Sequence, residues 1–186
     1  MWRDVDGDVL SLGILTEPFR HSDRADEIEL RRWCRGLAQS RGGGLIEAFA
    51  LDGGVRLIYK RLEMPAYVYT GMLITRVRED WLIWTMVAGE RGTTGVREAL
   101  VTANLMNAGK LTIDDYKLYW AQDPYEPAYR GVDRSVLRFM SDDETYDEQF
   151  PQHPLSKVRR NLATLPNYVE YGPLVAPGLP FGRCSE

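Results

Sequence analysis

Histidine and cysteine are scarce in this chain, since each occurs only twice among 186 residues. Two cysteines cannot form the disulfide framework of a small secreted domain. Neither histidine stands in a spacing typical of metal ligands, such as H-E-x-x-H, and a site made of His and Cys would need all four residues to converge. The sequence therefore predicts no metal, no cofactor and no assigned catalytic residue. His21 and His153 each precede an expected helix and are interpreted as structural residues.

The chain also lacks a long apolar run and a basic stripe. Its longest apolar stretch, 66–77, is interrupted by Tyr, Thr and Gly and is shorter than the roughly 18 residues that suggest a membrane span. Asp4, Asp6 and Asp8 stand where a secretory signal would be basic. The net charge of -4, with arginines scattered among acids, argues against general nucleic-acid binding. We expect a cytoplasmic protein with no membrane or nucleic-acid partner, and the 19 Arg against 4 Lys are typical of a GC-rich bacterial genome.

The composition that is present belongs to a globular domain. Hydrophobic residues make up 44% of the chain and charged residues 27%. A chain of this length buries roughly 70% of its unfolded surface, so it needs no covalent staple. We expect a single α+β domain over residues 1–165. Residues 166–186 are rich in Pro and Gly but also carry apolar side chains, which predicts a C-terminal tail, or an arm lying on this domain or on a partner.

Four strand patterns follow one another without an intervening helix. They cover 45–51, 55–62, 66–77 and 81–88. Asp52-Gly53-Gly54 joins the first two, because its glycines allow the positive φ that tight hairpins need. Short turns between sequential strands predict an antiparallel meander, and a fifth strand is expected over 135–140. Trp81 and Trp84 are expected on opposite faces of the sheet, which would leave one of them pointing away from the helices.

Helical patterns flank these strands. They run from about 23 to the glycines at 42–44, over 95–107, over 112–120 and from 154 onward. Thr93 or Thr94 is expected to cap the second helix, and Thr112 has capping-box spacing with Asp115 at the start of the third. The element order predicts an α+β fold with an antiparallel sheet of about four to five strands, one face of which packs on helices. This order loosely resembles the Mog1/PsbP-like sandwich and the dimeric bacterial secretion chaperones, which implies a fold and no function.

Two glycine-rich segments were candidates for anion binding. Gly42 to Gly44 lie between a helix and a strand, whereas a phosphate loop runs from strand to helix. The segment 89–95 has that second order, so its amides could hold an anion with Arg91 or Arg97 assisting. The alternative is a flexible loop that leads into a helix.

An acidic segment and an aromatic segment are the densest local features. The acidic segment is expected to form either a solvated loop or, together with Tyr146, a docking patch for a basic partner. Its acids are Asp142, Asp143, Glu144, Asp147 and Glu148. The aromatic segment is expected either to form a partner or ligand surface or to cover the sheet. Its aromatic residues are Tyr116, Tyr119, Trp120, Tyr125 and Tyr129.

The absence of a catalytic signature favours a non-catalytic protein-binding module, such as an adaptor, a secretion-related chaperone or an immunity-type protein. Its partner would be another protein or a second copy of the chain. The alternative is a small-molecule-binding protein or enzyme with its site between the sheet and the aromatic segment 116–129. The polar residues expected to line that site are Arg91, Arg97, Asp123, Tyr125 and Glu126.

Overall fold

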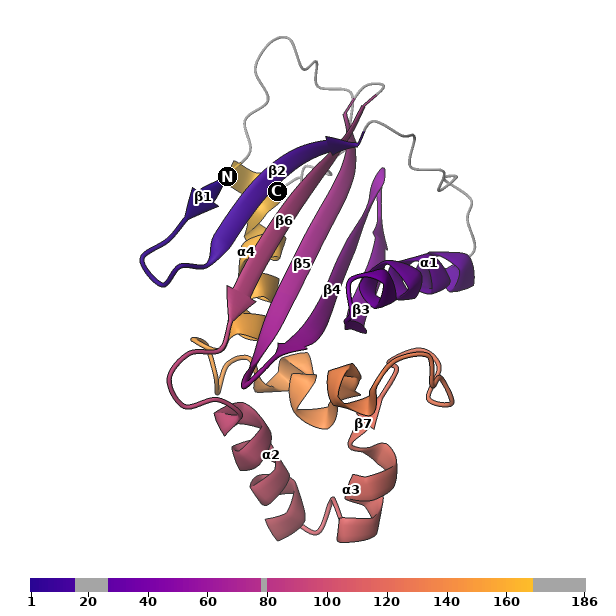
Figure 1. Ribbon diagram of the computed structural model, residues 1–186, viewed down its shortest axis with the longest axis vertical. Helices are drawn as coiled ribbons and strands as arrows, with labels where there is room; N and C mark the ends of the chain where they lie inside the picture. Colours follow the sequence, from indigo (N-terminus) through magenta and orange to yellow (C-terminus); the bar gives the residue numbers. More distant parts are fainter. Residues whose placement is uncertain (16–26, 78–79, 169–186) are drawn as a thin grey trace, which may run out of the picture.

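The computed structural model describes residues 1–15, 27–77 and 80–168 (Figure 1). The strands are β1 (Trp2–Arg3), β2 (Val9–Leu15), β3 (Gly44–Leu51), β4 (Gly54–Glu63), β5 (Ala66–Val77), β6 (Asp80–Gly89), β7 (Ala121–Gln122) and β8 (Arg138–Phe139). The helices are α1 (Glu27–Ser40), α2 (Val96–Asn107), α3 (Ile113–Tyr119) and α4 (Pro154–Tyr168). Three single-turn 3-10 helices are η1 (Arg134–Val136), η2 (Met140–Asp142) and η3 (Glu144–Tyr146).

A six-stranded antiparallel sheet forms the centre of the fold, in the order β1-β2-β6-β5-β4-β3. Strands β3 to β6 are the predicted meander, and the predicted α+β class is confirmed. Gly53, at φ 70°, makes the turn between β3 and β4 in the left-handed region that glycine tolerates.

The N-terminal hairpin supplies two strands that the sequence prediction missed. β2 pairs with β6 along its length, and β1 pairs with β2. Leu10, Leu12 and Ile14 alternate with other residues, which is a strand signal. This pattern covers only seven residues, and the segment forms a strand because it pairs with the edge of β6 that the meander leaves unpaired.

The prediction that residues 135–140 form a fifth strand of this sheet is wrong. Only β8 is extended, and it pairs with β7 in a separate two-stranded ribbon. Asp133 accepts a hydrogen bond from the amide of Ser135, and Asp142 accepts one from the amide of Phe139, both at 2.8 Å. These side chains satisfy backbone groups locally and so compete with a longer ladder.

Helices cover both faces of the sheet, so the expectation of one covered face is wrong (Figure 1). α1 buries Leu30, Cys34 and Ala38 on one face, and burial raises the pKa of the Cys34 thiol to about 12. α4 buries its predicted apolar stripe on the other face. The central strand explains this arrangement, because β5 is buried continuously from Val68 to Thr75 and so carries apolar side chains on both sides.

Trp81 and Trp84 lie on opposite faces, as predicted. Trp81 packs on the α1 side, whereas Trp84 is 8% exposed on the α4 side and stacks on Trp2, with ring centroids 6.3 Å apart. Neither tryptophan marks an uncovered sheet face, because each side has its own helix.

The segment from α2 to η3 forms a layer at one end of the sheet (Figure 1). The predicted capping box of Thr112 and Asp115 opens α3 and is confirmed. The expected cap of α2 by Thr93 or Thr94 is wrong, since its N-cap is Gly95 at φ 72° with no side-chain cap.

α4 begins at Pro154 as predicted and ends at Tyr168. His21 and the expected start of the first helix near 23 lie outside the described residues, as does the part of the expected tail over 169–186. Within the described ranges, no helix has the length and apolar character needed to cross a membrane.

Candidate functional site

A lysine–aspartate pair is buried where the sheet meets the layer at its end. Lys60 on β4 and Asp142 in η2 are both fully buried, and Lys60 Nζ lies 2.6 Å from Asp142 Oδ2. The ammonium also lies 3.1 Å from the centroid of the Phe139 ring, a cation–π contact. Burial lowers the pKa of Lys60, although Asp142 acts in the opposite direction. The prediction that Asp142 lies on a surface loop is therefore wrong, because its carboxylate holds both this ammonium and the Phe139 amide.

The rest of the acidic segment is largely tied into the fold. Asp147 forms ion pairs with two arginines, at 2.9 and 3.1 Å. Asp143 accepts a hydrogen bond from Arg138 at 2.8 Å, and Tyr146 packs partly buried on the core of the end layer. Glu144 is exposed. The expected docking patch is therefore not one continuous acidic surface.

Arg97, expected to assist an anion, is a buried structural residue. It is 1% exposed, and its guanidinium donates to four oxygens at 2.6 to 2.9 Å. The acceptors are the carbonyls of Ser141 and Asp143, Asp147 Oδ1 and Ser156 Oγ. A bound anion would therefore have to compete with these partners for the guanidinium.

The expected anion loop over 89–95 is filled by a carboxylate of the chain itself. Glu90 Oε1 accepts a hydrogen bond from the amide of Gly95, and Oε2 accepts one from the amide of Tyr67, both at 3.0 Å. The half-exposed side chain of Arg91 lies 3.6 Å from Asp8. The loop thus uses Glu90 to hold the start of α2.

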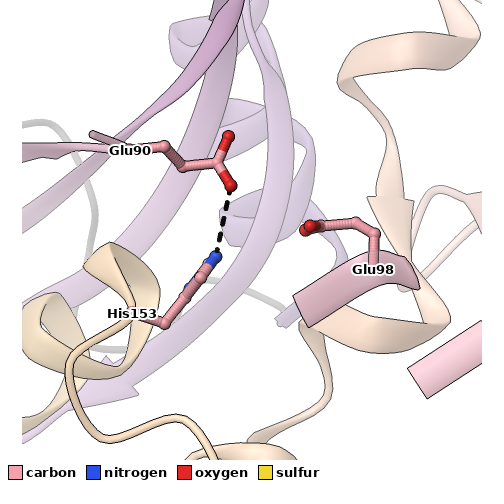
Figure 2. A group of neighbouring side chains, drawn as sticks. All are labelled: Glu90, Glu98 and His153. Carbon is pink, nitrogen blue, oxygen red and sulfur yellow. Dashed lines mark ion pairs between the residues drawn. The ribbon is translucent and has the colours of Figure 1, made fainter. Parts of the chain in front are cut away.

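Three titratable side chains from separate elements converge beside this loop (Figure 2). Glu90 follows β6, Glu98 lies in the first turn of α2, and His153 directly precedes α4. One candidate ligand atom from each lies within 4.8 Å of the other two, and His153 Nε2 is 3.7 Å from Glu90 Oε1. In Figure 2 the Glu98 side chain points toward the other two.

A hydrogen bond indicates the tautomer of His153, and burial and neighbouring charges shift the pKa values of the two glutamates in this carboxylate–histidine cluster. His153 Nδ1 accepts a hydrogen bond from the amide of Leu155 at 3.3 Å, so a neutral imidazole carries its proton on Nε2. Burial acts to raise the pKa of Glu90, but the nearby His153 imidazole and the hydrogen bonds from two backbone amides outweigh it and lower that pKa. Burial raises the pKa of Glu98, and Asp142 adds to the effect. Neither Glu98 oxygen has a hydrogen-bond partner on another described residue.

An aromatic cleft with a volume of about 530 Å³ is also lined by Glu98. Its wall is a row of rings in which Tyr116 stacks on Trp120 at 5.1 Å and Trp120 on Phe139 at 6.0 Å, while Tyr67 meets Phe139 edge-on at 5.6 Å. The other lining residues are Gly95, Glu98, Lys117, Ala121, Arg134 and Ser135. The cleft lies between the sheet and the first part of the aromatic segment.

The remaining aromatic-segment residues fasten a loop onto α1 and β3. Asp123 and Glu126 bind Arg35 through three bonds of 2.8 Å. The Tyr125 hydroxyl accepts from the amide of Ala48 and donates to its carbonyl. The Tyr129 hydroxyl bonds Gln39, while Tyr119 is exposed. None of the five polar residues expected to line a ligand site reaches the aromatic cleft.

A second cleft, of about 540 Å³, is lined by Glu90 and His153, which do not line the aromatic cleft. It contains Arg91 and is bordered by the N-terminal hairpin and α4. Lys157 Nζ lies 2.6 Å from Asp6 and 3.2 Å from Asp8, so the acidic residues of the hairpin already hold a cation of the chain.

Sequence patterns did not reveal Lys60, Glu90 or Glu98, because their partners are distant in the chain. His153 was identified only as a residue that precedes a helix. The one local signal is Ile58, which shares a strand face with Lys60 and indicates that this face is buried.

The fold and site define a class: an α+β protein whose antiparallel sheet is covered on both faces and whose end layer holds a carboxylate–histidine cluster beside an aromatic cleft. No family model, no curated protein and no solved structure matches this chain.

Proposed function

We propose that the chain binds a small, planar organic anion in the aromatic cleft. The observation that carries this proposal is the row of four contacting rings along a cleft of about 530 Å³. Ligand sites combine apolar and aromatic walls with a few polar groups that orient the ligand. A flat ring suits the exposed face of Tyr116, whose other face stacks on Trp120.

The charges of the lining favour an anion. Lys117 and Arg134 contribute two positive charges. Lys117 pairs with Asp114 only at the surface, where an ion pair is weak. Arg134 donates from Nη2 to the carbonyl of Tyr116, and its other guanidinium donors make no hydrogen bond to a described residue. Glu98 is the one acid that the described part of the chain contributes to the lining, and burial raises its pKa.

Anilinonaphthalene sulfonate, an aromatic anion with a planar naphthalene ring system, is a suitable probe. We expect saturable fluorescence enhancement, with binding about tenfold weaker in Tyr116→Ala and in Arg134→Gln, equivalent to about 1.4 kcal/mol. Tyr119→Ala is the matched control, because Tyr119 lies on the same helix outside the cleft. Equal affinity of all three variants and the parent protein would contradict the proposal.

Protein binding is the second candidate, with a second copy of the chain as the partner. Large apolar side chains of α2 and α3, each at least 41% exposed, favour it: Val96, Leu100, Ile113, Leu118 and Tyr119. Charges of both signs accompany them, which suits a self-complementary two-fold interface. Light scattering should then detect a dimer that Leu118→Asp dissociates, and a concentration-independent monomer would exclude it.

A further inference from the structure

We infer that the carboxyl group of Glu98 is a proton-controlled gate of the aromatic cleft. As a neutral acid it lies beside Glu90 and His153 and away from the cleft, and as a carboxylate it turns into the cleft and repels an anion there. This inference rests on the proposed binding function and adds a regulation by pH to it.

The position of the Glu98 side chain carries the inference. The residue lines the aromatic cleft and is partly exposed, but both of its oxygens are buried, and the side chain points toward Glu90 and His153 (Figure 2). Neither oxygen has a hydrogen-bond partner on another described residue. Burying an ion without partners costs far more than burying a neutral acid, so this orientation favours the protonated group.

The charges around the cluster also favour the neutral acid. The Glu90 carboxylate is fixed by two backbone amides, and one of its oxygens lies within 4.8 Å of a Glu98 oxygen. Two carboxylates in one buried site do not both ionise readily. Burial raises the pKa of Glu98, and Asp142 and Glu90 add to the effect, while its own amide and His153 oppose it. The titratable groups that interact with it are Glu90, His153, Asp142, Lys60, Tyr67 and Tyr69.

The direction of the pH dependence follows from these positions. The proton stabilises the buried orientation, so that stabilisation is complete below 4.5, the ordinary pKa of Glu, and is lost as the pH rises through the raised pKa.

The side chain moves, and not the helix, because Arg97 fixes the first turn of α2 through hydrogen bonds to four oxygens. Rotation about its own bonds brings the Glu98 carboxylate to the water of the cleft that it lines. A negative charge there offsets part of the positive charge of Lys117 and Arg134, which attracts the anion.

A bound metal ion is the competing role for this cluster, because oxygen and nitrogen atoms of Glu90, Glu98 and His153 are close enough to share one. His153 Nδ1 accepts from the Leu155 amide, so the Nε2 of the neutral ring carries a proton and offers no lone pair. Both oxygens of Glu90 already accept backbone hydrogen bonds. The cluster therefore fits a proton better than a metal ion.

Anilinonaphthalene sulfonate tests the gate, because its sulfonate keeps its charge when Glu98 titrates. We expect the parent protein to bind the dye about tenfold more weakly at about pH 8 than at about pH 5, equivalent to about 1.4 kcal/mol, which is the order of the repulsion between two nearby like charges at a hydrated site. Glu98→Gln should bind as tightly as the parent at the lower pH and lose this dependence. Glu144→Gln removes the same charge from an exposed position and should retain it.

A titration of Glu98 without the dye measures the same proton directly. NMR of isotope-labelled glutamate carboxyl groups should show one signal that is absent from Glu98→Gln and whose pKa lies above 4.5. His153→Asn should move this pKa further up, because His153 opposes the rise. Asn at this position can still accept a hydrogen bond from the Leu155 amide, so the start of α4 is preserved.

Each outcome decides between the two proposals. If the dye affinity changes with pH equally in the parent and in Glu98→Gln, or if the pKa of Glu98 lies at or below 4.5, the gate is overturned and the binding proposal stands on the dye affinity alone. If the dye binds at no pH, both proposals are overturned. A pH dependence that a chelator abolishes would assign the cluster to a metal ion and overturn the gate.

Discussion

At the scale of single residues, charge inside this protein is paired between distant positions. Lys60 and Asp142 are 82 residues apart, and Arg35 and Asp123 are 88 apart. Taking an ion out of water costs several kcal/mol, which its partner must offset. Each such pair therefore ties two remote segments together more strictly than apolar contacts do.

Lys60→Met should destabilise the protein by about 3–5 kcal/mol, because it leaves the Asp142 carboxylate buried without its counter-ion. The double variant Lys60→Met with Asp142→Asn should recover much of this loss, since Asn keeps an oxygen for the Phe139 amide and carries no charge. The free energy of unfolding in urea measures both effects. A single variant as stable as the parent would show that Asp142 is not held by this ion pair.

Residue identity alone could not place these groups. Arg97 is one of 19 arginines, and only tertiary structure shows that its guanidinium is enclosed by four acceptors. Asp142 stands in a run of acids that resembles a solvated loop, but its neighbour Ser141 is also fully buried. Charged residues are rarely buried, so a prediction from sequence places them at the surface. That prediction is wrong for each charged residue that is buried.

At the scale of elements, the contact of α4 with the sheet depends on a glycine. A Cβ added to Gly71 on β5 would lie 2.4 Å from Val158 Cγ1 and 2.5 Å from Leu162 Cδ1. Real side chains do not approach this closely, so α4 lies against β5 only because position 71 has no side chain.

Gly71→Ala should therefore cost about 1–3 kcal/mol of stability through overpacking. Adding Val158→Ala makes room for the new methyl group, so its cost should be smaller in the Gly71→Ala protein than in the parent. Gly13→Ala on β2 is the control, because nothing lies within 4 Å of its added Cβ and stability should change little. Thermal unfolding followed by circular dichroism measures the series. Additive effects of the two core changes would contradict this packing account.

The helices and strands that could be predicted from the sequence are those whose formation a local sequence pattern determines. The meander and α4 follow from apolar periodicity and turn residues, and the Thr112 capping box is a purely local device. The segment 135–140 failed because Asp133 and Asp142 satisfy its amides, which apolar periodicity does not register. β2 was missed because its alternation is short and its pairing partner lies more than sixty residues away.

At the scale of the whole molecule, the candidate site lies where the end of the sheet meets α2 and the start of α4. The aromatic cleft could be anticipated because Tyr116 and Trp120 are neighbours in sequence. The carboxylate–histidine cluster could not, because Glu90, Glu98 and His153 come together only when β6, α2 and α4 meet at the end of the sheet. Sequence thus indicates the aromatic wall of the site, and the tertiary fold brings its titratable side chains together.

The N-terminal hairpin closes the molecule on the α4 side. β2 covers the open edge of β6, Trp2 stacks on Trp84, and Lys157 of α4 holds Asp6 and Asp8. Removing residues 1–15 should therefore expose the edge of β6 and the face of Trp84. An uncovered strand edge with apolar neighbours is a template for pairing between chains.

We expect the truncated protein to unfold at a lower temperature and to self-associate, as measured by circular dichroism and light scattering. Lys157→Ala separates the causes, because it leaves the strand pairing in place and removes the ion pairs to Asp6, which is exposed, and to Asp8, which is buried. It should cost about 1–3 kcal/mol, since the Asp8 carboxylate loses a buried partner. If the truncated chain stays monomeric and unfolds with the parent, the hairpin is an appendage. If Lys157→Ala reproduces the whole loss, the ion pairs, and not the strand, hold the hairpin in place.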